Sequence, residues 1–193
     1  MKIYQLMHRA GVGSIIATPR NDHFVSEYLR KFPDVPAEAV MPSFQLADPA
    51  KAHADFFRID NSVLVFTKKI LMSPLGQSLA YAGNIHPTTL NDTGEEIFLL
   101  NVTAEYNCLD QANTIFHTAH GDEKGVDHQM GIKTPAFFTT MIGDSSLFRL
   151  PQKRRSAIYV ASRGHESSDD FYHTFHQLGL TSIEFRQVWD DEL

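Results

Sequence analysis

Short apolar segments, separated by turns and by only a few helical stretches, constrain the fold of this chain more than any other feature of its sequence. Residues 63–66 are a short apolar run of the kind found in buried strands, residues 97–102 are apolar except for Asn101 and also predict a strand, and residues 183–189 alternate as a half-buried strand does. Residues 146–150 and 157–160 also have the composition of strands. Short strands interleaved with few helices predict a single α+β domain whose strands are mainly antiparallel.

Two helices are predicted between these strands, in similar positions. Thr67 is a candidate N-cap for a helix that ends at Gly83. Ser168 or Asp169 can cap a second helix, which ends at Gly179. Both glycines suit a helix end because glycine accepts the left-handed conformation there. Each helix follows one predicted strand and precedes another, so we interpret the two strand–helix–strand units as a pseudo-repeat.

The first part of the chain, residues 1–58, is less regular. Glycines and prolines interrupt it at short intervals. Short helices fit between them at residues 23–31 and 49–57, the second with Asp48 as its N-cap. We therefore expect an irregular N-terminal region, residues 1–58, packed on a main α+β domain, residues 59–193.

Charge and composition exclude several classes of protein. The chain has 193 residues, of which 17 are Lys or Arg and 23 are Asp or Glu, so its net charge is −6. Proteins that bind nucleic acids generally carry a basic excess, so we expect no nucleic-acid partner. Hydrophobic residues make up 42% of the chain, which is enough to form a core, so intrinsic disorder is not expected.

The single cysteine and the short apolar runs indicate the compartment. One thiol cannot form an intramolecular disulfide or a cysteine-based zinc site, and Cys108 is interpreted as a small buried apolar residue. No apolar run approaches the roughly 18 residues that span a bilayer, and the first residues lack the apolar core of a signal peptide. We expect a cytoplasmic protein with no membrane partner.

The common motifs of nucleotide and acyl chemistry are missing from the sequence. Gly11 and Gly13 lack the third glycine of a dinucleotide-binding loop, because Ile16 stands at that position. The chain also has no phosphate-binding loop and no nucleophile elbow. These absences exclude several common enzyme classes, though not all, and we expect no cofactor and no enzymatic activity.

A histidine-rich stretch is the most suggestive polar cluster. His117 and His120 lie three residues apart, so they can share one side of a helical turn and ligate a divalent metal. Asp122 or His128 would complete the site. The same stretch also fits a polar surface loop, because it is rich in glycine and charged residues. The loop is our interpretation, and a metal-dependent enzyme is the alternative.

Several acidic residues form a candidate binding surface for a basic partner. Carboxylates that converge on one face create a negative potential that steers a positively charged protein toward it. The candidate residues lie in the middle of the chain and at its end: Asp122, Glu123, Asp127, Asp190 and Asp191.

Four short motifs within residues 60–190 resemble those of a known bacterial family. They are a leucine-asparagine-valine-threonine segment at 100–103, a leucine-aspartate pair at 109–110, a phenylalanine-arginine-leucine strand at 148–150, and a glycine-leucine strand with a later phenylalanine at 179–185. The family was long described as a domain of unknown function and is now assigned to immunity proteins of polymorphic toxin systems. Ser182 departs from the pattern, which has a glycine there.

The resemblance implies a function that needs no catalysis. An immunity protein binds its cognate toxin and blocks it, so the family assigns no catalytic residues to this chain. We expect a cytoplasmic immunity protein whose partner is a basic toxin, with nucleases as one candidate class. Two alternatives stay open: a metal-dependent enzyme that uses residues 117–128, and a general protein-interaction module.

Overall fold

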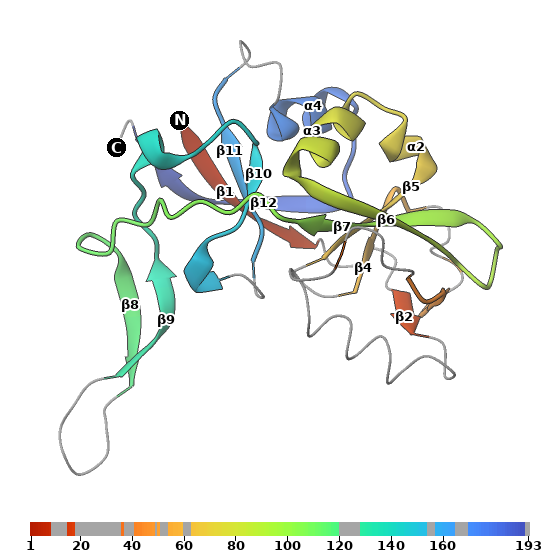
Figure 1. Cartoon of the computed structure of the whole chain (residues 1–193), viewed down its shortest axis with the longest axis horizontal. Helices are drawn as coiled ribbons and strands as arrows, with labels where there is room; N and C mark the ends of the chain where they lie inside the picture. The colour runs from red at the N-terminus through yellow and green to blue at the C-terminus, as the bar shows by residue number, and fades with distance from the viewer. Residues whose placement is uncertain are drawn as a thin grey trace.

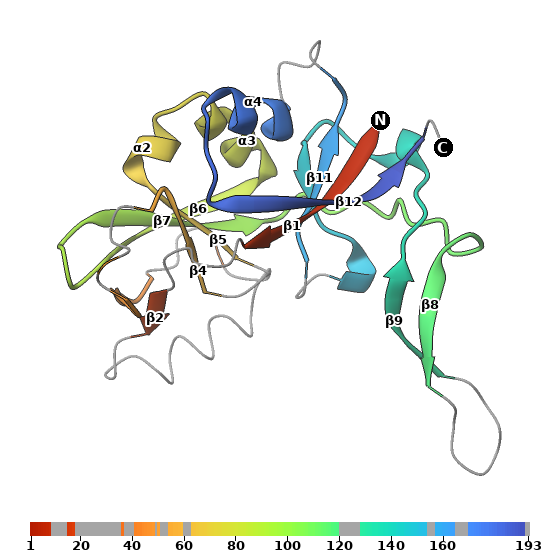
Figure 2. The ribbon, with the colours of Figure 1, turned by 180° about the vertical axis from the view of Figure 1, so that it is seen from behind.

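Two four-stranded antiparallel sheets, with helices packed on one side, form the frame of the molecule in the computed structural model (Figures 1 and 2). The structure describes residues 1–8, 15–17, 36, 41–48, 50, 54–59, 63–119, 128–153, 157–164 and 170–191. Its short, mostly antiparallel strands and few helices confirm the predicted α+β class.

The first sheet is built from the middle of the chain in the order β4-β5-β7-β6. Its inner strands, β5 (Leu64–Thr67) and β7 (Glu96–Val102), coincide with predicted strands. Its edges are β4 (Phe56–Arg58) and β6 (Gly83–Thr89). Residues 97–102 of β7 are all buried, as in a strand that is covered on both faces.

The second sheet has the order β10-β11-β1-β12. Three of its strands, β10 (Leu147–Phe148), β11 (Tyr159–Ser162) and β12 (Ile183–Asp190), lie in the predicted C-terminal strands or overlap them. The fourth, β1 (Lys2–His8), lies between β11 and β12 and runs antiparallel to both. The sequence predicts no strand there. The division near residue 58 stays a prediction, but β1 shows that the first residues complete a sheet of the second part.

The two sheets share one topology. In each, a short edge strand pairs with the next strand, the chain passes through helix, and the following strand runs parallel to the one before the helix. One strand separates the two in both sheets: β7 lies between β5 and β6, and β1 lies between β11 and β12. The matching order agrees with the predicted pseudo-repeat. The separating strand differs, because β7 follows β6 directly whereas β1 comes from the other end of the chain.

The first predicted helix forms as two short helices. α2 (Lys68–Leu71) has Thr67 as its N-cap, although the Thr67 side chain makes no capping hydrogen bond. α3 (Leu75–Ala82) begins after Pro74 and buries Leu75 and Leu79. The break is explained by Pro74, which has no N–H to continue α2 and suits the start of α3.

The reason predicted for Gly83 at the end of α3 is wrong. Its φ of 166° is extended rather than left-handed. A Cβ atom at this position would lie 2.0 Å from the carbonyl oxygen of Asn101 and 2.7 Å from the backbone nitrogen of Thr103. Glycine is therefore required by the close approach of β7 and not by the turn.

The second predicted helix is α4 (Phe171–Gln177). Its N-cap is Asp170, one residue later than the nearest predicted cap, and the Asp170 carboxylate accepts a hydrogen bond from the backbone nitrogen of His173 at 3.1 Å. Gly179 follows with φ of 66°, which confirms the predicted left-handed stop. Leu178, directly after the helix, is exposed.

Three buried clusters define the layers of the molecule. The largest contains side chains from α2, α3 and α4 and from one face of both sheets, so the helices and the two sheets share one core. The opposite face of the first sheet packs against β3 (Phe44–Leu46), which pairs with β2 (Ile15–Ala17). The opposite face of the second sheet packs against residues between 104 and 142.

The predicted helix at residues 49–57 is wrong in its last part. Phe56 and Phe57 lie in β4, where Phe56 contacts the central core and Phe57 the core on the other face of the sheet. Adjacent side chains reach opposite cores only in a strand. Asp48 still caps locally, because its carboxylate accepts a hydrogen bond from the backbone nitrogen of Ala50 at 3.1 Å. The helix predicted at residues 23–31 lies outside the described residues.

Candidate functional site

A hairpin that projects from the body is the most distinctive feature of the surface. It is formed by β8 (Ile115–Ala119) and β9 (His128–Thr134), which pair with each other and with no other strand in the described part of the chain. Figures 1 and 2 show it extending away from both sheets. Because a two-stranded sheet is marginally stable by itself, the hairpin depends on its base. Among its described side chains, Ile115, His117 and Lys133 are exposed and available to a partner.

A network of backbone and side-chain hydrogen bonds fixes the base of the hairpin. The Phe138 nitrogen donates to the carbonyl of Cys108 at 2.8 Å, and the Asp110 nitrogen donates to the carbonyl of Ala136 at 2.9 Å. The buried Thr114 hydroxyl accepts from the Ala136 nitrogen at 3.0 Å and donates to the Asp110 carbonyl at 2.6 Å. The two sides of the base are therefore held in one register.

The Asp110 carboxylate shapes the loop that leads into β8. It accepts hydrogen bonds from the backbone nitrogens of Ala112 at 3.0 Å and Asn113 at 3.2 Å, and from the Asn113 side-chain amide at 2.7 Å. Such a turn around an aspartate orders the loop without regular secondary structure. The carboxylate of Asp110 is thus a structural acceptor.

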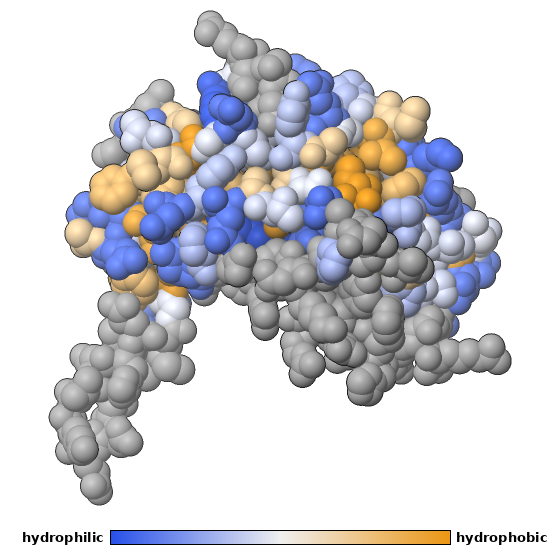
Figure 3. Space-filling view, viewed as in Figure 1, coloured by the Kyte–Doolittle hydropathy of each residue, from blue (hydrophilic) through white to orange (hydrophobic). Residues whose placement is uncertain are grey.

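A cavity of about 610 Å³ opens at this base, and we call it the base cavity. Exposed apolar side chains mark it, because Phe138 is 52% and Met141 is 60% exposed. Apolar colour gathers where the hairpin leaves the body in Figure 3. The base cavity is lined by Asn107, Leu109, Asp110, Gln111, Ala112, Phe138, Thr140 and Met141. Its chemistry is that of a pocket for an apolar side chain, with amide groups at its rim.

Cys108 lies behind the base cavity and is fully buried. It packs in the cluster on the outer face of the second sheet, with Leu109 and Phe137 among its members. Burial raises the pKa of its thiol from 9.0 to about 11. The neutral thiol is a poor nucleophile, so the predicted role of Cys108 as a small apolar core residue fits its surroundings.

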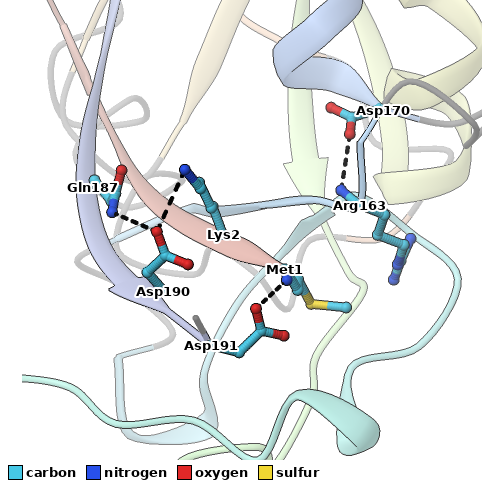
Figure 4. A network of polar contacts seen from close by, with 7 residues as sticks. All are labelled: Met1, Lys2, Arg163, Asp170, Gln187, Asp190 and Asp191. Atoms are coloured by element: carbon cyan, nitrogen blue, oxygen red, sulfur yellow. Dashed lines mark hydrogen bonds and ion pairs between the residues drawn. The ribbon is translucent and has the colours of Figure 1, made fainter. Parts of the chain in front are cut away.

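Asp190 and Asp191, two of the predicted binding residues, are already paired with cations of this chain (Figure 4). The Asp190 carboxylate lies 3.4 Å from the ammonium of Lys2 and accepts a hydrogen bond from the Gln187 amide at 3.3 Å. Its side chain is only 8% exposed. Asp191 pairs with the α-ammonium of Met1. These contacts connect the ends of β1 and β12, and the role of the two carboxylates in binding a partner stays a prediction.

The other predicted binding residues, Asp122, Glu123 and Asp127, lie outside the described residues. Their sequence positions are between β8 and β9. The acidic surface predicted for them stays a prediction, and it belongs to the same part of the chain as the hairpin.

Two of the three histidines of the predicted metal site, His117 and His128, belong to the hairpin. His117 is exposed on β8 opposite Gly131, and His128 begins β9 opposite Ala119. His120 lies outside the described residues, as does Asp122. Within the ranges described above, no three His, Cys, Asp or Glu side chains form a group that could hold a metal ion.

Comparisons with known proteins do not assign a family. A scan of protein-family models finds none that matches the chain, and a search of curated proteins finds no similar sequence. None of the helices in the described part of the chain combines the length and the apolar character that crossing a bilayer requires. The resemblance of residues 60–190 to immunity proteins stays a prediction that rests on its motifs.

Sequence reasoning missed the residues that mark the base cavity. Phe137 and Phe138 are adjacent in the sequence, yet Phe137 is buried and Phe138 is exposed. A signal was present, because two adjacent aromatic residues in extended backbone must send their side chains in different directions. Which of the two faces solvent depends on contacts with the second sheet, which the local sequence does not contain.

Proposed function

We propose that this protein acts by binding another protein, and that the partner is a toxin which it neutralises. The observation that carries this proposal is the base cavity, where Phe138 and Met141 expose apolar surface beside a projecting hairpin. Aromatic and methionine side chains are enriched in protein interfaces, where burying them contributes much of the affinity. An exposed pair of this kind next to a concave site is typical of a binding surface.

The motifs behind the family resemblance lie in parts of the structure that suit this proposal. Residues 100–102 belong to the buried strand β7, and residues 148–150 are buried as well. These segments support the fold. The leucine-aspartate pair is different, because Leu109 and Asp110 line the base cavity. One of the shared motifs thus contributes to the surface that we assign to the toxin.

The charge of the chain supports a basic partner. With a net charge of −6, the protein attracts a positively charged toxin over distances up to about a Debye length, which is roughly 8 Å at physiological salt. Nucleases that act in the cytoplasm are candidates of this kind. Attraction of this type raises the association rate more than the affinity.

Co-expression with the toxin encoded beside this gene tests the proposal. The wild-type protein should protect a host cell and bind the toxin at equal molar ratio. The double variant Phe138→Ala, Met141→Ala should bind roughly 30- to 1,000-fold more weakly, because each of the two interface anchors contributes on the order of 1–2 kcal/mol. Tyr81→Ala is the matched control: Tyr81 is 64% exposed on α3, so its variant should protect like the wild type.

The outcomes separate the alternatives. A host that dies despite wild-type protein, with every neighbouring toxin tested, would contradict the immunity function. Tight binding to a partner that is not toxic would instead support a general interaction module. Equal protection by the double variant and by Tyr81→Ala would show that toxin binding uses a surface other than the base cavity.

A further inference from the structure

A row of three polar side chains crosses one face of the second sheet. Gln5 of β1 pairs with Tyr159 of β11 on one side and with Arg186 of β12 on the other. Residues directly opposite each other in antiparallel strands send their side chains to the same face, with Cβ atoms about 5 Å apart. Tyr159, Gln5 and Arg186 therefore lie side by side. The row interrupts a face on which Ile3 and Val188 pack into an apolar cluster.

Strand β9 turns this row into the floor of a second cavity, which we call the sheet pocket. Its volume is about 280 Å³. The segment around the end of β9 contributes Lys133 and Thr134 as a wall. Its described lining residues are Gln5, Ile132, Lys133, Thr134, Pro135, Tyr159, Arg186, Gln187 and Val188. The sheet pocket is separate from the base cavity, because the two share no lining residue.

The sheet pocket is positively charged in a chain that is negative overall. Arg186 and Lys133 each bring one positive charge, and the described lining residues include no Asp or Glu. The guanidinium of Arg186 donates a hydrogen bond to the side-chain oxygen of Gln5. This contact orients Arg186 along the floor and uses one of its five N–H donors, which leaves a fork of donors for a ligand.

The floor also provides a neutral hydroxyl donor. Burial raises the pKa of the Tyr159 phenol to about 12, although the nearby charge of Arg186 acts to lower it. The phenol is therefore protonated at neutral pH and can donate its hydrogen. A guanidinium, an ammonium, a phenol and an amide on one concave surface form a set of donors for negatively charged oxygen atoms.

We propose that the sheet pocket binds an oxyanion, a carboxylate or a phosphate group, on Arg186, Lys133 and Tyr159. The volume fits a small anion or the end of one acidic side chain, since small-molecule pockets generally start at roughly 300 Å³. The group that binds belongs either to a free anion or to a partner protein. This inference goes beyond toxin binding at the base cavity and does not depend on it.

Calorimetric titration of the full chain at constant ionic strength tests the inference. The probes are inorganic phosphate, glutarate and a blocked tetrapeptide that contains one glutamate. At least one should bind the wild-type protein, and Arg186→Gln should weaken that binding about tenfold or more, because a charge-assisted hydrogen bond is lost. Lys68→Gln is the matched control, since Lys68 is an exposed cation on α2 and its variant should bind like the wild type.

Each result has one meaning. Binding of phosphate or glutarate alone assigns a free anion, and binding of the peptide assigns a protein carboxylate. If Arg186→Gln does not fold, Lys133→Gln gives the same comparison, because Lys133 is exposed on β9. Failure of all three probes to bind the wild type overturns the inference. So does an equal loss of affinity in Lys68→Gln, which would indicate a general charge effect.

Discussion

At the scale of single residues, the thiol of Cys108 links burial to pH. Its pKa is about 11 in the folded protein, above the ordinary 9.0, so the folded state favours the neutral thiol. This preference contributes about 2–3 kcal/mol to the free energy of unfolding. The contribution is fully present below pH 9 and is lost as the pH rises to about 11. Urea unfolding at several pH values should therefore show that the free energy of unfolding of the wild type decreases relative to that of Cys108→Ala across this range. A constant difference between the two proteins would contradict the prediction.

Gly83 provides a second test at this scale. An alanine there would place its Cβ against the Asn101 carbonyl and disturb the hydrogen bonds that the Thr103 and Ala104 nitrogens donate to the Ala82 carbonyl. We expect Gly83→Ala to lower the free energy of unfolding by about 3 kcal/mol. Gly94→Ala is the control: Gly94 has φ of 69° and open space around it, so only backbone strain of about 1–2 kcal/mol is expected. Chemical denaturation measures both, and a smaller loss at Gly83 would refute the steric explanation.

At the scale of elements, the stability of the hairpin depends on the hydrogen bonds at its base. Thr114→Val keeps the shape of the side chain but leaves the buried Ala136 nitrogen without its hydrogen-bond acceptor. We expect a loss of about 2 kcal/mol and faster hydrogen exchange at the Ala136 amide, with little change in the two sheets. Thr89→Val, at the exposed end of β6, should change neither measurement. Unchanged exchange at Ala136 would mean that the hydroxyl does not hold the base.

The same scale shows what the sequence can predict. Strands β5, β7 and β12 and the glycine stop after α4 follow from local patterns, so they were predicted. Strand β1 was not, because its apolar side chains form no long pattern and its partners lie more than 150 residues away in the chain. The base cavity and the sheet pocket were missed for the same reason: each combines residues from distant segments, and Phe138 and Arg186 acquire their roles only from those neighbours.

At the scale of the whole molecule, the shared topology predicts that β1 can be moved to the end of the chain. Lys2 pairs with Asp190, so Asp191 and Met1 stand where a two-residue hairpin loop would connect β12 to β1. In the permutant, Asn-Gly replaces Asp191 and Met1, residues 192 and 193 are removed, and the chain is opened between residues 8 and 15. We expect it to fold, with a free energy of unfolding within about 2 kcal/mol of the wild-type value. The surface pair of Met1 and Asp191 that it loses contributes little.

Circular dichroism and urea unfolding measure this outcome. A second permutant, opened between Leu99 and Leu100 in the middle of β7, is the control and should not fold, because it cuts a fully buried inner strand. If the first permutant also fails to fold, the connection between β12 and β1 is not equivalent to the one between β6 and β7, and the pseudo-repeat is superficial.

The inner position of β1 also has a consequence for how the protein is made. The ribosome releases β1 before strands β4 to β7, but the two neighbours of β1, β11 and β12, emerge only after those strands. The sheet of β4 to β7 can form first, whereas β1, with its buried residues Ile3, Tyr4 and Leu6, cannot pair until β11 and β12 have emerged. Insertion of β1 is then a late step in folding. Until it happens, the nascent chain presents an unpaired strand that a chaperone, or a second nascent chain, can capture.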